Sequence, residues 1–192
     1  MASTVAMPFL DGSLHAGASA FKVVVAGPVG VGKTTFINTI SEVQTVSTEA
    51  AISDGSDLGD KHTTTVGIDF GQVSLRDGLE LYLFGTPGQE RFSFMWDIVS
   101  EGMLGVILLV DCSRPETHEA SRRLLEHFRA TSDVPVIIAA NKSANLAADY
   151  DGIVSALGLT EHDFVVPTDA RDRAAVKQTL IELLELVVSS LV

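Results

Sequence analysis

The chain has 192 residues, of which 46% are hydrophobic and 20% are charged, and its formal net charge is −12. This length suffices for one domain with a sizeable core, and the composition is ordinary for a globular protein. The strong negative charge repels nucleic acid and anionic lipid, so we expect no direct nucleic-acid partner and no direct membrane insertion.

The single cysteine, Cys112, follows the apolar run 106–110 and is predicted to be a packing residue rather than a nucleophile. One thiol cannot form an internal disulfide, which is typical of a reducing compartment and favours a cytoplasmic location. Residues 1–20 are rich in Ala, Ser and Gly, so we expect a flexible arm without a secretory signal, followed by a single domain over 21–192. The apolar segment 180–192 is shorter than the roughly 20 residues of a membrane span.

The first predicted element is a strand over 21–26, an apolar run without alternation that is typical of a parallel sheet. The segment 27–35, Gly-Pro-Val-Gly-Val-Gly-Lys-Thr-Thr, matches the phosphate-binding pattern G-x-x-x-x-G-K-[ST] and leads into a predicted helix over 35–43. Its glycines allow backbone N–H groups to face phosphate oxygens, and the helix N-terminus adds further donors. A Gly-rich turn without a ligand is the alternative, which the placement of Lys and Thr disfavours.

Within this loop, we predict that Lys33 reaches the β- and γ-phosphates and that the Thr34 hydroxyl ligates magnesium. The predicted nucleotide-binding residues of the loop are Gly27, Val29, Gly30, Val31, Gly32, Lys33, Thr34 and Thr35.

The segment 41–64 contains many Ser, Thr, Asp, Gly and Glu residues and little apolar periodicity. A long loop inside a compact domain is usually functional, so we predict a functional loop here, with a solvated insertion as the alternative. The apolar stretches 68–75 and 79–84 flank Asp77-Gly78, a strong hairpin turn signal. One strand therefore runs antiparallel to its neighbour, which predicts a mostly parallel sheet with one antiparallel edge strand.

The remaining chain alternates strand and helix patterns. Apolar runs predict strands over 104–110 and 134–140, and apolar residues at helical spacing predict helices over 116–130 and 174–188. This alternation indicates an α/β fold with right-handed crossovers and helices on both faces of the sheet.

Two further motifs lie between these elements. Residues 63–70 read Thr-Thr-Thr-Val-Gly-Ile-Asp-Phe, and residues 84–92 read Phe-Gly-Thr-Pro-Gly-Gln-Glu-Arg-Phe. With the phosphate-binding loop, their order resembles the Ras-like small GTPases, from about residue 21 to the C-terminus. The long segment 41–64 and the Thr-Pro-Gly-Gln form resemble bacterial MglA-like GTPases, and most of all the actinobacterial conservon GTPases of the MfpB type. This resemblance implies a P-loop NTPase fold, GTP/GDP and Mg²⁺ as ligands, and a Roadblock-type regulator and an effector as partners.

The resemblance also implies roles for single residues. Thr65 would close over the γ-phosphate and complete the magnesium shell begun by Thr34, and Gly88 would donate its N–H to the γ-phosphate. Gln89 would orient the attacking water, so Gln89, Lys33 and Thr65 are the predicted catalytic residues. Loss of the γ-phosphate would then release both loops, which is a switch mechanism.

The base-recognition motifs come last in the chain. Residues 141–144, Asn-Lys-Ser-Ala, resemble the family pattern Asn-Lys-x-Asp, in which the Asn joins the loops and the Lys stem packs on the base. The run 168–171, Thr-Asp-Ala-Arg, resembles the final motif, whose Ala N–H meets the guanine oxygen. The implied nucleotide-binding residues at this end are Asn141, Lys142, Thr168 and Ala170.

Three positions depart from the family pattern. Ala144 stands where the guanine-reading Asp belongs, a loss of about 2–4 kcal/mol of guanine binding unless Asp149 or Asp169 substitutes. Gly85 stands where an Asp normally holds a magnesium-bound water, and the resembled MglA-like proteins also lack this Asp. Val29 stands where many members have Gly and crowds the γ-phosphate, so we predict slow hydrolysis.

Three functions fit these motifs. The leading one is a regulatory switch that slowly hydrolyses GTP to GDP, with any stimulating arginine supplied by a partner. The segment 92–96 contributes Phe92, Phe94, Met95 and Trp96 either to an effector surface or to the core. A nucleotide-binding scaffold with relaxed base specificity (GTP or ATP) is the alternative. A small-molecule kinase is disfavoured because the sequence lacks an Arg-rich lid.

Overall fold

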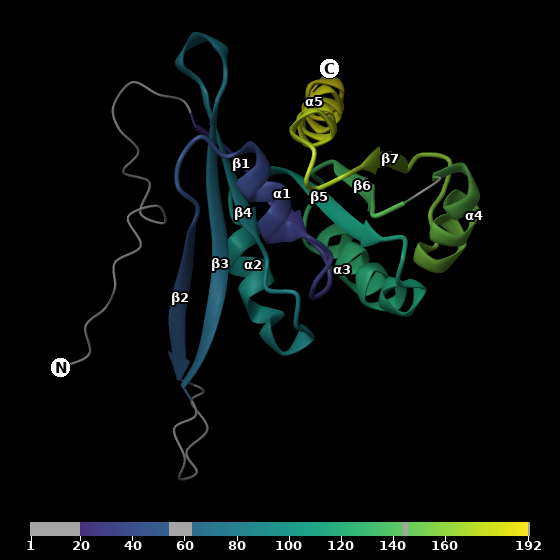
Figure 1. The fold of residues 1–192 in the computed structure, drawn as a ribbon, viewed down its shortest axis with the longest axis horizontal. Helices are drawn as coiled ribbons and strands as arrows, with labels where there is room; N and C mark the ends of the chain where they lie inside the picture. Colours follow the sequence, from purple (N-terminus) through teal and green to yellow (C-terminus); the bar gives the residue numbers. More distant parts are fainter. Residues whose placement is uncertain (1–19, 54–62, 144–145, 192) are drawn as a thin grey trace, which may run out of the picture.

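The structure is a computed structural model that describes residues 20–53, 63–143 and 146–191. These residues form a seven-stranded sheet in the order β2-β3-β4-β1-β5-β6-β7, with helices on both of its faces (Figure 1). The strands are β1 (Ala20–Ala26), β2 (Val46–Ser53), β3 (Thr63–Ser74), β4 (Glu80–Gly85), β5 (Met103–Asp111), β6 (Val136–Asn141) and β7 (Phe164–Thr168). The helices are α1 (Lys33–Ile40), α2 (Phe94–Ser100), α3 (His118–Thr131), α4 (Leu146–Leu157) and α5 (Arg173–Ser190).

The sheet buries an apolar layer on each face. Along β1, Val23 and Val25 pack toward α1 and α5, whereas Val24 and Ala26 pack toward α2, α3 and α4. Because successive side chains of a strand point to opposite faces, a strand covered on both sides must be apolar throughout. This explains why the strands predicted from unalternating apolar runs are all present.

The predicted fold class is confirmed, and one strand runs against the others. That strand is β3, which pairs antiparallel with both β2 and β4, while the other neighbouring strands pair in parallel. β3 lies second from the edge of the sheet, because β2 pairs beside it as the edge strand. The β2–β3 ribbon extends beyond the rest of the sheet at the left of Figure 1.

The prediction of a loop over 41–64 is wrong for Val46–Ser53, which forms β2 and pairs with β3 over eight residue pairs from Val46↔Phe70 to Ser53↔Thr63. Ladder hydrogen bonds involve main-chain groups only, so a Ser- and Thr-containing segment can form an edge strand without hydrophobic alternation. The predicted turn at Asp77-Gly78 is confirmed, since both residues have positive φ, at 62° and 75°.

The three predicted helices are found within a few residues of their expected bounds, as α1, α3 and α5. The predicted arm 1–20 lies, apart from Ala20 in β1, outside the described residues. None of the described helices is both long enough and apolar enough to cross a membrane.

Candidate nucleotide-binding site

The predicted site residues other than Thr65 come together along the edge of the sheet where the parallel strands end. The loop after β1 carries 27–32, the loop after β4 carries Gly88 and Gln89, and the ends of β6 and β7 carry Asn141 and Thr168. Ligands of open α/β sheets bind at the carboxyl ends of the strands, so the fold places these residues where a ligand is expected.

The loop between β1 and α1 requires glycine at three positions. Gly27, Gly30 and Gly32 have φ of 147°, 74° and 114°, a region that side chains disfavour. A Cβ on Gly27 would lie 2.7 Å from the Leu109 carbonyl oxygen, and one on Gly32 would lie 2.8 Å from Asn141 Nδ2. The loop backbone therefore lies too close to β5 and to the Asn141 side chain for a Cβ to fit at Gly27 or Gly32.

Lys33 begins α1, and its side chain lies folded back into the loop. Its Nζ donates to the carbonyl oxygens of Gly27 at 2.7 Å and Pro28 at 2.9 Å. Burial lowers the pKa of Lys33 to about 8, and the nearby Asp69 carboxylate opposes that effect. The ammonium is thus held by two loop carbonyls at the position where the motif predicts phosphate oxygens.

Asp69, which was not predicted as a site residue, lies beside Gly85. The two residues lie directly opposite each other on β3 and β4, and a Cβ on Gly85 would lie 3.1 Å from Asp69 Cβ. Asp69 Oδ2 accepts a hydrogen bond of 2.5 Å from the Thr34 hydroxyl. A carboxylate therefore occupies the region that the missing Asp at position 85 would serve. The signal was the hairpin register, which could have been counted from the Asp77-Gly78 turn.

The loop after β4 packs tightly against the phosphate-binding loop. A Cβ on Gly88 would lie 2.7 Å from the Val29 nitrogen and 2.8 Å from Lys33 Nζ. Trp96 holds the same loop from α2, since its Nε1 donates to the Pro87 carbonyl oxygen at 3.0 Å. The exposed Gln89 lies beside Gly88 on a cavity of about 340 Å³, which is lined by Val29, Gly30, Lys33, Thr34, Asp69, Thr86, Pro87, Gly88, Gln89 and Phe92.

A second cavity of about 440 Å³ lies on the other side of the loop, at the ends of β6 and β7. Its lining comprises Gly32, Thr35, Asn141, Lys142, Ser143, Thr168, Asp169, Ala170 and Arg171. Asn141 joins three loops, because its Nδ2 donates to the Val31 carbonyl oxygen at 2.8 Å and its Oδ1 accepts from the Ala170 N–H at 3.1 Å. This is the joining role that the motif predicted for Asn141.

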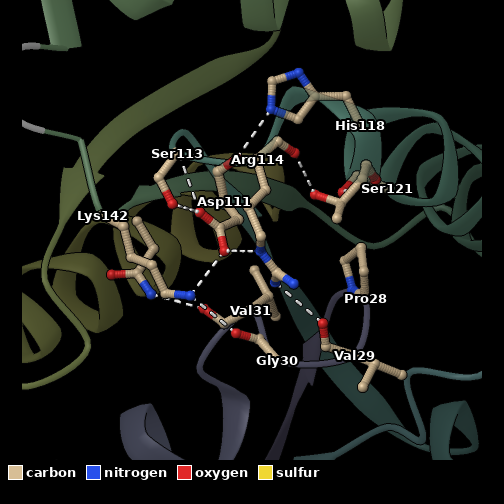
Figure 2. A network of polar contacts seen from close by, with 12 residues as sticks. Pro28, Val29, Gly30, Val31, Asp111, Ser113, Arg114, His118, Ser121 and Lys142 are labelled. Atoms are coloured by element: carbon tan, nitrogen blue, oxygen red, sulfur yellow. Dashed lines mark hydrogen bonds and ion pairs between the residues drawn. The ribbon is translucent and has the colours of Figure 1, made fainter.

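Lys142 belongs to an ionic network around the buried Asp111 at the end of β5 (Figure 2). Its Nζ donates to the Gly30 carbonyl oxygen at 2.9 Å and to Asp111 Oδ2 at 2.7 Å. Arg114 donates from Nε to the same Asp111 oxygen at 2.7 Å and from Nη2 to the Val29 carbonyl oxygen at 3.1 Å. Burial alone would raise the pKa of Asp111, but hydrogen bonds from Lys142, Ser113 and Arg114 outweigh burial and lower it to about 2.

The two candidate substitutes for the missing guanine-reading Asp lie in different surroundings. Asp169 lines the 440 Å³ cavity and forms an ion pair of 2.8 Å with Arg171, whose hydrogen bonds lower the pKa of Asp169 to about 2. Asp149, in α4, accepts a hydrogen bond of 2.6 Å from the hydroxyl of Ser143 in the loop after β6. Ala144 itself lies outside the described residues.

Thr65 lies in β3, where its backbone pairs with Ala51, and its side chain lies outside the described part of the chain.

The side chains of the aromatic segment 92–96 differ in burial. Met95 and Trp96 are buried, at 6% and 5% exposure, whereas Phe94 is 46% exposed.

Burial raises the pKa of Cys112 to about 11, which agrees with a packing residue rather than a nucleophile.

A glycine-rich loop, a buried lysine at a helix N-terminus and a flanking Asn-Lys pair define a P-loop nucleotide-binding protein. Over residues 42–191 the chain matches the family described as "conserved hypothetical ATP binding protein", and it belongs to that family. It is 32% identical over 125 residues to the uncharacterized protein MJ1339 of Methanocaldococcus jannaschii, covering 64% of this chain and 70% of that protein.

Other relatives carry GTPase-family names. The chain is 26% identical over 171 residues to Ras-related protein RIC2 of Oryza sativa, covering 85% of this chain and 73% of that protein. It is 27% identical over 142 residues to ADP-ribosylation factor-like protein 14 of Mus musculus, covering 72% of this chain and 64% of that protein. These relatives support membership of the Ras-like small GTPase superfamily, while the family match, which begins at residue 42, carries an ATP-binding description.

Proposed function

We propose that this protein is a GTP-binding switch that slowly hydrolyses GTP to GDP. The observation that carries this proposal is the contact between the Gly88 loop and the phosphate-binding loop, 2.7 Å from a Gly88 Cβ position to the Val29 nitrogen. A terminal phosphate seated on Lys33 would have to contact or displace Gly88. The presence or absence of that phosphate would therefore set the position of the loop that Trp96 anchors to α2.

Lys33 and the loop N–H groups would bind the phosphates. In this proposal the Lys33 ammonium exchanges the Gly27 and Pro28 carbonyl oxygens for phosphate oxygens. The Thr34 hydroxyl and the Asp69 carboxylate provide oxygen donors 2.5 Å apart, the donor chemistry that magnesium prefers. Thr34 would ligate the ion directly and Asp69 would hold a water bound to it, while the ion neutralises the charge of the phosphates.

The switch would require movement of the first part of β3. Thr65 precedes Asp69 by four residues, which is about 13 Å of extended strand. Since Asp69 is bonded to Thr34, Thr65 can complete the magnesium shell only if this part of the ribbon leaves its present register with Ala51. GTP binding would thus remodel the β2–β3 ribbon, and loss of the γ-phosphate would let the ribbon re-form.

Hydrolysis would depend on Gln89, which is exposed beside Gly88 and able to orient a water molecule. The Val29 side chain is 55% exposed on the same cavity, where it crowds the approach of that water and favours a slow rate. The alternative function is a scaffold that binds GTP or ATP without turnover, and the ATP-binding description of the family favours it.

For the base, we propose that Ala170 N–H, the Lys142 stem and the Asp169 carboxylate bind guanine. Asp169 lines the cavity and can accept from the ring N–H and amino groups of guanine once it leaves Arg171. Adenine lacks this pair of donors on adjacent atoms, so the Asp169 carboxylate would restore discrimination without a carboxylate at position 144.

We further propose that the protein belongs to the MglA-like and conservon branch, is cytoplasmic, and responds to a Roadblock-type regulator and an effector. The exposed Phe94 and Ile98 of α2, 46% and 44% exposed, would form part of the nucleotide-dependent surface.

The proposal is tested by measuring binding of GTP, GDP and ATP with magnesium to nucleotide-free protein, followed by single-turnover hydrolysis. We expect guanine nucleotides to bind at least about a hundredfold more tightly, equivalent to about 2.7 kcal/mol. Gln89→Leu should slow hydrolysis without weakening GDP binding. Equal affinity for ATP, or a Gln89→Leu variant as fast as the parent, would favour the scaffold instead.

A further inference from the structure

Arg114 forms contacts that the predicted nucleotide-binding motifs do not explain. It lies just beyond β5, where its guanidinium bridges two groups through different nitrogens: Nε to Asp111 and Nη2 to the carbonyl oxygen of Val29 (Figure 2). Asp111 has no exposed surface, and its other oxygen accepts from the Ser113 N–H and hydroxyl at 3.1 and 2.6 Å. The carboxylate is therefore fixed, and it fixes the direction in which Arg114 points.

The consequence for the loop follows from peptide geometry. In a trans peptide, the C=O of one residue and the N–H of the next point in opposite directions. The structure describes no cis bond, so a Val29 carbonyl that faces Arg114 directs the Gly30 N–H away from Arg114. Both residues line the 340 Å³ cavity, whereas Arg114 is not part of its lining. Arg114 therefore holds one donor of the loop toward the phosphate cavity.

That donor lies at the end of the cavity where hydrolysis would occur. Val29 and Gly30 share the 340 Å³ cavity with Gly88 and Gln89, whereas Gly32 and Thr35 line the base cavity. During hydrolysis, water bonds to the γ-phosphorus and passes a proton to an oxygen of the released phosphate, while the bond from that phosphorus to the bridging oxygen breaks. The electron pair stays on the departing diphosphate, so charge develops on the bridging oxygen and a fixed N–H nearby stabilises it.

We propose that Arg114 is a positioning residue for hydrolysis, which holds the Val29–Gly30 peptide so that the Gly30 N–H faces the phosphate bond that breaks. The inference rests on the proposed function and adds to it an arginine of the chain itself. The sequence had suggested that any arginine assisting hydrolysis is supplied by a partner. Hydrogen bonding of a cation to the carbonyl also polarises the peptide and strengthens its N–H as a donor.

The guanidinium suits this role better than an ammonium does. Its planar fork offers separate donors to the carboxylate and the carbonyl at fixed angles, whereas a lysine presents a single point charge. Lys142 already makes the corresponding bridge from Asp111 to the next carbonyl, that of Gly30. Two successive loop carbonyls are thus held by two cations that share one buried anion.

The test compares Arg114→Ala and Arg114→Lys with the parent protein in single-turnover hydrolysis of bound GTP and in GDP affinity. We expect Arg114→Ala to slow hydrolysis by about 10- to 30-fold, less than the loss of a direct oxyanion donor. GDP affinity should change by less than about threefold, because the breaking bond is absent from GDP. Arg114→Lys should recover the rate only in part. The Arg114 side chain is 36% exposed, so added guanidinium at sub-denaturing concentration should raise the rate of Arg114→Ala.

Arg122→Ala is the matched control, since Arg122 lies on α3 and forms ion pairs with the exposed Glu119 and Glu126. A second measurement requires nucleotide binding but no hydrolysis. In NMR spectra with a non-hydrolysable GTP analogue bound, Arg114→Ala should shift the Gly30 amide proton resonance upfield, because the guanidinium no longer polarises that peptide. An unchanged hydrolysis rate with an unchanged Gly30 resonance would overturn the inference, as would equal losses of rate and GDP affinity. A parent protein that binds no nucleotide would instead show that the proposed function has failed, and the inference with it.

Discussion

The two ends of the candidate site each lack a carboxylate that the resembled family carries, and they differ in how a substitute is held. At the phosphate end, Gly85 leaves space that Asp69 fills from the neighbouring strand, where eight ladder pairs on one side and six on the other hold β3. At the base end, Asp169 lies in the loop after β7 and is paired with Arg171, whose side chain is 82% exposed.

This difference shows two ways in which a function can move from one position to another. A cross-strand partner is fixed by register, so its geometry is set before any ligand arrives. A loop residue in an exposed ion pair must exchange one partner for another, and such pairs are worth only about 0–1 kcal/mol. We therefore expect the phosphate end to depend strongly on its substitute carboxylate and the base end to depend on it less.

Exchanging the carboxylate between strands is expected to have the largest effect. Asp69→Gly should weaken magnesium-dependent GDP binding by about 10- to 100-fold, the range found when a group supporting a metal ligand is removed. The double variant Asp69→Gly/Gly85→Asp should regain most of that loss, because it returns a carboxylate to the same cross-strand position. Titration of magnesium at fixed GDP measures both variants.

The exposed Asp133→Ala provides the control for loss of one negative charge. Gly85→Asp alone should be worse than the parent, since its Cβ would lie 3.1 Å from both Asp69 Cβ and Ile37 Cδ1 and two carboxylates would face each other. A double variant no better than Asp69→Gly would contradict the idea that register alone carries the function.

The predictability of the two ends from sequence also differed. The phosphate loop was predicted because its glycines, Lys33 and Thr34 are contiguous in the chain. Asp69 was missed because its importance arises only when β3 and β4 are paired, and β2 was missed because an edge ladder leaves no periodic apolar signal. Asp111 and Arg114 were missed for a related reason: their partners, the Val29 carbonyl and Lys142, come from two other loops.

Asp169→Asn tests the base end and is expected to have an intermediate effect. The carboxamide keeps one acceptor but replaces the other with a donor, so GTP affinity should fall by about tenfold, the loss of one charge-assisted hydrogen bond. Xanthosine triphosphate, which has a carbonyl in place of the guanine amino group, should bind the variant better than it binds the parent. Asp149→Asn is the matched control because Asp149 is held by Ser143. An unaltered preference between the two nucleotides in Asp169→Asn would exclude Asp169 from base recognition.

The smallest effect expected is a pH dependence confined to the phosphate end. Asp111 and Asp169, with pKa values of about 2, remain ionised at every pH above neutrality, whereas Lys33 has a pKa of about 8 in the nucleotide-free protein. Phosphates favour the charged lysine, so binding must return a proton to any Lys33 that has lost it. Affinity for GDP should therefore be nearly constant below about pH 7 and fall by roughly five- to tenfold between pH 7.5 and 9.

This dependence has a direct thermodynamic signature. Calorimetry in two buffers of different ionisation enthalpy should detect proton uptake on GDP binding at pH 9 and little at pH 7. Lys33→Arg, whose guanidinium stays protonated, should bind more weakly at neutral pH yet show no decline to pH 9. If Lys33→Arg declined as the parent does, the titrating group would lie elsewhere, and the base end would have to be reconsidered as the source. If the parent showed no decline at all, the two carbonyls of Gly27 and Pro28 would be holding the ammonium charged despite its burial.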